Sequence, residues 1–573
     1  MRSLKVLTRF VVLLALLAAL PTATSGGAAG AAVPTGLPTH FGIGLAGHPD
    51  STGIYGWMPN SGIAFDYAYQ YLAGGVNTGN GWQTWNTSGQ FPLWYAQGSA
   101  SHGYVPVFPY YQLLQSNGPC NSCGEAQRDL ANLNSASTMA SYYADFTVLM
   151  KRLGSGTWDG IAGFGTTAIV HVEPDLSGYA EQAALDSSAC YGFCTASGNN
   201  PSFVKASVAS SGVAAVAGFA DTYTGFNQAL LHLRDIYAPN VLLAFHVSDW
   251  ATRYDVGSST DATLDWTALG NQAGAFAGAA GVTQVGPGTS TYDLVFNDVA
   301  DRDAGYYKYV YGRSNAFWDR LNSTLPNFHV WEQYLKAVTT TTGKSAIVWQ
   351  IPLGNQWFQT ENNTDGHYQD NRAEYFFSHL AELKQTGVIA LLFGRGNGGS
   401  TTNEDDKADG VTNPPSICKT DGVSSGQVCN NHASTVSDDD GGYVRMASTS
   451  YYAAPLPLDG TPPPPPPPDT TPPPPPVVTR PTGAVGVGRR VSTYTVKGTA
   501  EAAALVRAWV DVNGNGLKDA GEPLAASAQL AAGATSWSLN VSLVRGVNRF
   551  VVTGTDAAGN QSAARAVPTI TRT

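Results

Sequence analysis

The sequence predicts two folded parts: a large α/β domain built as a (β/α)8 TIM-type barrel, and a C-terminal all-β sandwich that follows a Pro-rich linker. Three observations lead to this prediction. Between residues 33 and 455, short apolar runs alternate with helix-like segments, which favours a parallel sheet covered by its own helices. A nearly pure proline tract follows at 461–476. Short strands separated by glycine turns then continue to residue 573.

The expected barrel strands are apolar runs of the kind that are buried on both faces in parallel sheets. In chain order they are Phe41–Ala46, Phe65–Leu72, Tyr104–Tyr110, Ile169–Glu173, Val241–Val247, Tyr292–Asn297, Ser345–Ile351 and Val388–Phe393. The intervening helices are expected at Met139–Leu153, Val213–Ile236, Asn315–Val338 and Asp370–Lys384. A doubly wound open sheet is the alternative, but no Gly-x-Gly-x-x-Gly follows an early strand.

The linker, residues 456–479, is expected to be an extended, semi-rigid spacer because proline runs adopt the polyproline II conformation. Residues 480–573 are then a separate β domain. Its expected strands are Ser492–Val496, Ala504–Val510, Ser536–Leu543 and Arg549–Thr553.

A calcium motif lies between two of these strands. Asp511, Asn513, Asn515, Asp519 and Glu522 occupy positions 1, 3, 5, 9 and 12 of a twelve-residue loop, with Gly at position 6. Hard oxygen ligands at this spacing surround one point, which predicts a structural Ca²⁺ site and no other cofactor. An Asx-rich turn without a ligand is the alternative.

Composition and the N-terminus indicate an exported protein. Charged residues make up 13% of the chain, aromatics 11%, and the net charge is −11, which argues against nucleic acid as a partner. A positively charged start, the apolar run Phe10–Leu20 and small residues after it predict a signal peptide over 1–32. An uncleaved anchor is the alternative. We expect a secreted, extracellular monomer without a membrane span in its mature form.

Six cysteines form three close pairs: Cys120 with Cys123, Cys190 with Cys194, and Cys418 with Cys429. In an exported chain, each pair is expected to form a local disulfide. A zinc site at Cys120 and Cys123 is the alternative, but it would need a second pair with matching spacing.

Acidic residues follow the predicted strands at the barrel end where such folds place their chemistry. Glu173 ends the fourth strand and Asp298 follows the sixth. Cleavage of a glycosidic bond needs one carboxyl kept protonated and a second one ionised. We therefore predict Glu173 and Asp298 as the catalytic pair. A helix N-cap or loop ion pair is the alternative for Glu173, and a buried partner of Arg302 or Arg395 for Asp298.

Other side chains at the strand ends are expected to bind the substrate, because aromatic faces stack on sugar rings and polar groups bind hydroxyls. They are His171, Asp175, His246, Asp249, Trp250, Asp301, Gln350 and Trp357. Strand alternation predicts that His171, Glu173 and Asp175 tend toward one side. A metal held by His171, Glu173, His246 and Asp249 is the alternative.

Several segments resemble those of known families. Val172-Glu173-Pro174-Asp175-Leu176 is similar to the Glu-Pro-Asp at a strand end in family six cellulases. Asp301-Arg302-Asp303 resembles their Asp-Arg-Asp, although in this chain it follows the Glu-Pro-Asp and in that family it precedes it. In the small domain, Lys497-Gly-Thr-Ala-Glu-Ala and Thr555-Asp-Ala-Ala-Gly-Asn-Gln-Ser resemble bacterial immunoglobulin-like modules appended to exported enzymes. The resemblance implies a secreted bacterial glycoside hydrolase with an immunoglobulin-like accessory module.

The sequence thus predicts a glycosidase that acts on a polysaccharide or oligosaccharide. Two alternatives remain open: a non-catalytic carbohydrate-binding or cell-surface protein, and a metal-dependent hydrolase on the same barrel.

Overall fold

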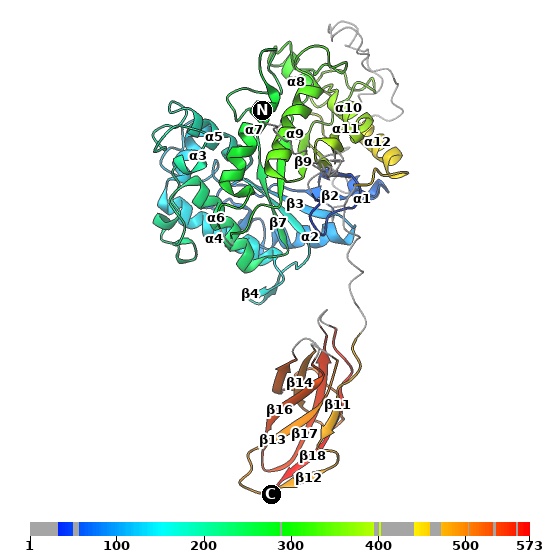
Figure 1. The fold of residues 1–573 in the computed structure, drawn as a ribbon. Coiled ribbons are helices and arrows are strands. Elements are labelled where there is room, and N and C mark those ends of the chain that lie inside the picture. The colour runs from blue at the N-terminus through cyan, green and yellow to red at the C-terminus, as the bar shows by residue number, and fades with distance from the viewer. Residues whose placement is uncertain are drawn as a thin grey trace, which may run out of the picture. The chain divides into compact units, whose positions relative to one another are not determined.

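The computed structural model describes residues 32–47, 49, 57–286, 289–394, 400–402, 432, 441–458, 472–501, 504–530, 534–556 and 560–573. The chain divides into two compact units, Met1–Pro463 and Pro464–Thr573 (Figure 1). Nearly all of the predicted signal peptide and most of the proline tract lie outside the described residues. Within the described ranges, no helix has the length and apolar character needed to cross a membrane.

Parallel strands close into an eight-stranded barrel in the first unit, which confirms the (β/α)8 prediction. Around the barrel they are β1 (Gly42–Ala46), β2 (Tyr67–Tyr69), β3 (Val105–Tyr110), β6 (Ala168–Val172), β7 (Val241–His246), β8 (Leu294–Asp298), β9 (Ala346–Ile351) and β10 (Val388–Phe393). The barrel closes where β10 pairs with β1, from Gly42 opposite Ala390 to Leu45 opposite Phe393. Each strand overlaps one of the runs expected from the sequence, because continuous apolar runs mark strands with two buried faces.

Helices surround the barrel (Figure 1). They are α1 (Trp57–Asn60), α2 (Phe91–Ser101), α3 (Glu125–Leu133), α4 (Ala136–Leu153), α5 (Pro174–Leu185), α6 (Tyr223–Tyr237), α7 (Trp266–Ala277), α8 (Ala304–Tyr309), α9 (Phe328–Thr342), α10 (Arg372–Ser378), α11 (Leu380–Gln385) and α12 (Gly442–Tyr452). The helix expected over 370–384 is two helices, α10 and α11, and α6 and α9 begin well after the positions expected from the sequence. The side chain of Thr222 accepts from the backbone N–H of Gly225 and caps α6, and Asn327 caps α9 in the same way.

The second unit contains two β-sheets, which confirms its all-β prediction. One sheet has the order β11 (Val477–Arg480), β13 (Thr493–Thr499), β16 (Ser536–Ser542). The other has the order β12 (Val485–Val487), β18 (Arg565–Arg572), β17 (Gly546–Thr555), β14 (Leu505–Val510), β15 (Leu524–Gln529). Exposed and buried residues alternate along β16, so that Trp537, Leu539 and Val541 enter an apolar core.

The linker is shorter than expected from the sequence at both ends. Phe41 and Thr39 exchange backbone hydrogen bonds with Leu456 and Leu458, which attaches the chain after α12 to the entry of β1. At the other end, β11 begins at Val477 and pairs with β13, so residues 477–479 belong to a sheet and not to the linker.

Two of the three predicted disulfides are present. Cys120 is bonded to Cys123, and Cys190 is bonded to Cys194. The third predicted pair, Cys418 and Cys429, lies outside the described residues, so that its disulfide stays a prediction. Both observed bonds link cysteines only three or four positions apart and therefore stabilise single loops.

Candidate functional site

A cleft of about 600 Å³ lies at the C-terminal ends of the barrel strands. Its walls come from the segments that follow β2, β3, β6, β7, β8 and β9. Six carboxyl groups line it: Glu125, Asp175, Asp249, Asp255, Asp298 and Asp301. Arg313 and Arg372 are the lining arginines, and both lie against aromatic rings, of Tyr307 and Trp318 respectively. The cleft is therefore acidic, with aromatic side chains among the acids.

Asp175 lies in the first turn of α5, after Pro174, and lines the cleft. Burial raises the pKa of this carboxyl well above its usual value, and repulsion from Glu125, Asp298 and Asp301 adds to the effect. A hydrogen bond with Tyr111 acts in the opposite direction. A carboxyl with a raised pKa retains its proton closer to neutral pH, which is the property that a general acid requires.

Glu173 is not among the residues that line the cleft, and its catalytic role stays a prediction. Its backbone leaves the extended conformation, with φ 39°, and strand alternation ends there. The carboxylate accepts from the backbone N–H groups of Gln112 (3.1 Å) and Leu113 (3.3 Å) and is only 2% exposed. Burial raises the pKa of Glu173 to about 8. This side chain therefore joins the end of β6 to the segment after β3.

His171, His246 and Asp298 form a chain of contacts from the barrel interior to the cleft. His171 is fully buried, and its Nε2 lies 3.1 Å from Nδ1 of His246. Nε2 of His246 lies 3.2 Å from Oδ1 of Asp298. Burial lowers the pKa of His171 well below its usual value, so its ring is neutral. The tautomer that satisfies both contacts has His171 donating to His246, which in turn presents its Nε2–H to Asp298.

Asp249 and Arg372 form the wall beyond Asp298. Burial raises the pKa of Asp249 well above its usual value, Asp255 and Asp298 raise it further, and Arg372 lowers it. Arg372 is held in place by Asp370, whose Oδ2 accepts from Nη1 at 2.6 Å, and its guanidinium lies over the ring of Trp318. Arg372 is a cationic wall residue that does not appear among the predicted site residues.

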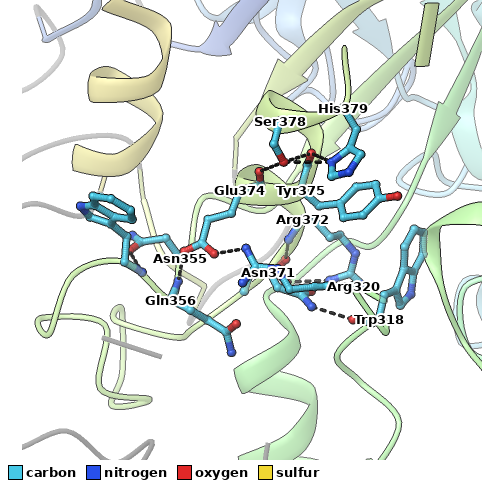
Figure 2. Close-up of polar contacts among 12 residues, drawn as sticks. Trp318, Arg320, Asn355, Gln356, Asn371, Arg372, Glu374, Tyr375, Ser378 and His379 are labelled. Atoms are coloured by element: carbon cyan, nitrogen blue, oxygen red, sulfur yellow. Dashed lines mark hydrogen bonds and ion pairs between the residues drawn. The ribbon is translucent and has the colours of Figure 1, made fainter. Parts of the chain in front are cut away.

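A network of polar contacts supports Arg372 (Figure 2). The side chain of Asn371 donates to the backbone carbonyl of Trp318 at 2.7 Å. Glu374, in the first turn of α10, accepts from the backbone N–H of Gln356 at 2.8 Å and pairs with Arg320. These contacts join the segment after β9 to the segment between α8 and α9, which fixes one wall of the cleft.

Three more of the predicted substrate-binding residues line the cleft. Asp301 pairs with Arg302 at 2.7 Å and accepts from the Tyr307 hydroxyl. Trp250 packs against Tyr179, with their ring centroids 4.9 Å apart. Gln350 accepts from the Tyr71 hydroxyl at 3.0 Å, and its backbone has φ 54°. A left-handed conformation in a residue other than glycine is strained, and such strain is often found at functional sites.

Trp357 does not line the cleft, so its predicted role in substrate binding is not supported. Its ring stacks on His432 with centroids 3.8 Å apart.

The cleft also contains three residues that were not among the predicted site residues: Tyr71, Tyr111 and Glu125. The two tyrosines lie one or two residues after the ends of β2 and β3, and this position in the sequence could have identified them as residues of the cleft. Among the described residues, no three of His171, Glu173, His246 and Asp249 have ligand atoms that all lie within 4.8 Å of one another.

The loop between β14 and β15 carries the predicted calcium ligands. Asp511 accepts from the backbone N–H groups of Gly514 (2.7 Å) and Gly516 (3.0 Å), and both glycines have φ near +75°. Glu522 accepts from the backbone N–H groups of Val512 and Asp519. Hydrogen bonds from Asn513 and Asn515 lower the pKa of Asp519. The five side chains thus belong to one closed loop whose oxygen donors fit Ca²⁺.

No family model matches the chain, and no curated protein does. Among solved structures, it is similar to a modular endo-β-1,4-mannanase from Cellulomonas fimi (11% identity, 93% of this chain and 94% of that chain, TM-score 0.38). It is also similar to a family 1 β-glucosidase from Thermotoga maritima (10%, 74% and 100%, TM-score 0.34). A third is a glycoside hydrolase family 5 enzyme from Prevotella bryantii (8%, 63% and 91%, TM-score 0.31). At these values the similarity does not define an activity for this chain.

Proposed function

We propose that the barrel is a glycoside hydrolase in which Asp175 is the general acid and Asp298 is the nucleophile or base. The observation that carries this proposal is the raised pKa of Asp175, a cleft carboxyl that interacts electrostatically with Asp298 from another strand end. Glycosidic cleavage needs two carboxyls in different protonation states. His246 supports the second role because its Nε2 lies 3.2 Å from Oδ1 of Asp298.

The proposed substrate is a polysaccharide or oligosaccharide. Half-buried aromatic side chains line the cleft at Tyr71, Tyr111, Tyr179, Trp250 and Tyr307. Rings of this kind offer apolar faces to sugars, while the surrounding acids and Gln350 can accept hydrogen bonds from hydroxyls. The acidic lining disfavours phosphorylated or carboxylated ligands, so the proposal specifies a neutral sugar chain.

Two variants and two kinds of substrate test the pair. Asp175→Asn should lower kcat/KM on a neutral polysaccharide by at least about a thousandfold. It should retain much more activity on an aryl glycoside whose leaving group needs no proton. Asp298→Asn should lower activity on both substrates. Asp159→Asn is the matched control, because Asp159 lies outside the cleft and its φ of 54° suits asparagine.

Wild-type levels of hydrolysis in both cleft variants would overturn the catalytic proposal. Binding of polysaccharides by a wild-type protein that hydrolyses none of them would instead favour a non-catalytic carbohydrate-binding protein.

We also infer that the β14–β15 loop binds Ca²⁺ as a structural ion in an immunoglobulin-like module. Support comes from the alternating strands, the two sheets and the oxygen donors of the loop. Adding Ca²⁺ to metal-free protein should raise the unfolding midpoint of this unit, because a ligand of the native state stabilises it. Asp511→Asn and Glu522→Gln should abolish the increase, and an unchanged increase in both would contradict the assignment.

We also propose that the protein is secreted. The positively charged start and the apolar run Phe10–Leu20 support export, and the disulfides Cys120–Cys123 and Cys190–Cys194 suit an oxidising compartment. A third disulfide between Cys418 and Cys429 belongs to the same proposal, since both cysteines would be exposed to that compartment.

A further inference from the structure

A second group of polar side chains lies outside the cleft, between helices α9 and α11. His329 and Glu332 are one turn apart on α9, so they share a face of that helix, and Glu382 comes from α11. One ligand atom of each lies within 4.8 Å of the other two. Nε2 of His329 and Oε2 of Glu382 are 3.9 Å apart. In the described part of the chain, this is the one group of His, Cys, Asp or Glu with such spacing.

These side chains line a small cavity of about 190 Å³. Glu332 is only 8% exposed, and its Oε1 has no hydrogen-bond partner among the described residues. Oε2 of Glu382 likewise accepts no hydrogen bond there. A buried carboxylate oxygen without a partner is costly, and a bound cation removes that cost. The two oxygens and the imidazole therefore form an incomplete coordination shell.

We propose that His329, Glu332 and Glu382 bind a divalent transition metal of the zinc type and thereby join α9 to α11. An imidazole with two carboxylates suits Zn²⁺, whereas Ca²⁺ and Mg²⁺ prefer sites made of oxygen alone. Zinc bonds of about 2.0–2.2 Å would bring the ligand atoms closer than they now are. His329 is 50% exposed and Glu382 is 44% exposed, so both side chains can rotate toward the buried Glu332.

The proposed role is structural. Neither α9 nor α11 contributes a residue to the acidic cleft. Three protein ligands leave a fourth position for water, and the exposed half of the site gives the ion an entry path. Lys336 lines the same cavity, one turn beyond Glu332, and its charge opposes cation binding. The affinity should therefore be moderate and should respond to removal of that lysine.

Zinc titration of the full, metal-free protein tests the site. Isothermal calorimetry should detect one more bound Zn²⁺ in the wild type than in His329→Ala or Glu332→Gln. Zinc should raise the thermal unfolding midpoint of the barrel in the wild type and not in these variants. His232→Ala removes an exposed histidine from α6 and is the matched control, which should bind as the wild type does. Lys336→Ala should bind zinc more tightly.

Equal zinc stoichiometry and affinity in the wild type, His329→Ala and Glu332→Gln would overturn the proposal, as would weaker binding by Lys336→Ala. Glu382→Gln, at a more exposed position, provides an independent variant if the Glu332 change impairs folding. It should weaken zinc binding at least tenfold, and unchanged binding would also count against the site. The absorption spectrum of bound Co²⁺ should disappear in His329→Ala, Glu332→Gln and Glu382→Gln.

Discussion

His246 is the residue through which the buried interior of the barrel contacts the cleft. It accepts from His171 at Nδ1 and faces Asp298 with Nε2. Its surroundings leave it little freedom, because His171 is itself packed against Phe296 and Trp349. In the proposed mechanism, His246 is therefore a positioning residue for Asp298, and the contact with His171 sets the tautomer of His246.

A substitution at His246 separates this role from simple packing. His246→Phe keeps an aromatic ring and removes both polar contacts. A hydrogen bond to a charged group contributes about 1.5–3 kcal/mol, so kcat/KM should fall about ten- to hundredfold. His246→Gln can still donate to Asp298 and should recover part of the loss. The pH profile of kcat/KM should change shape in the Phe variant. An unchanged profile with equal loss in both variants would indicate a packing role alone.

At the scale of single elements, the end of β6 shows where prediction from sequence stops. The apolar run and Pro174 correctly indicated a strand and its end, but they did not predict the helix α5 that begins at Pro174. They could not indicate the left-handed backbone at Glu173, because glutamate rarely adopts it. Glu173 contacts the backbone of Gln112 and Leu113 and does not line the cleft, whereas Asp175, in the first helical turn, does. Trp357 was misplaced for a related reason, since a long loop has no periodicity to orient its side chains.

Glu173 connects two loops at this end of the barrel, and a variant tests that connection. Glu173→Gln keeps an oxygen that can accept from Gln112 and is expected to lower kcat/KM less than about tenfold. The reason is that the side chain contacts the segment leading to the cleft and not the cleft itself. Kinetic constants measured beside those of Asp175→Asn provide the comparison. A loss as large as that of Asp175→Asn would restore Glu173 as a catalytic candidate.

At the scale of the whole molecule, the sequence was sufficient for the architecture and insufficient for the site. Eight apolar runs predicted eight strands because burial on both faces leaves a strong local signal. The acids at the strand ends were also identified, and Asp175, Asp249, Asp298 and Asp301 all line one cleft. The protonation states of Asp175 and Asp249 depend on burial and on neighbours distant in sequence, such as Glu125 beside Asp175. No local pattern encodes those neighbours.

Buried acids outside the cleft make the stability of the barrel depend on pH. Burial raises the pKa of Glu173, Glu181 and Asp303 to about 8 each. In an unfolded chain, such groups titrate near pH 4. Between these values the folded state binds more protons than the unfolded state. The free energy of unfolding therefore falls as pH rises, by about 1.4 kcal/mol per pH unit for each proton of difference.

We expect the barrel to be most stable near pH 4–5 and to lose several kcal/mol of stability as pH rises through 8. Asp319, whose pKa is lowered to about 2, contributes in the opposite sense only below pH 4 and does not offset the loss. Urea unfolding at pH 5, 6, 7 and 8, followed by tryptophan fluorescence, measures the slope. Glu181→Gln removes one buried ionisation and should flatten it, whereas Asp159→Asn should leave it unchanged. A free energy of unfolding that increases from pH 5 to 8 would show that these carboxyls are ionised in the folded protein and paired.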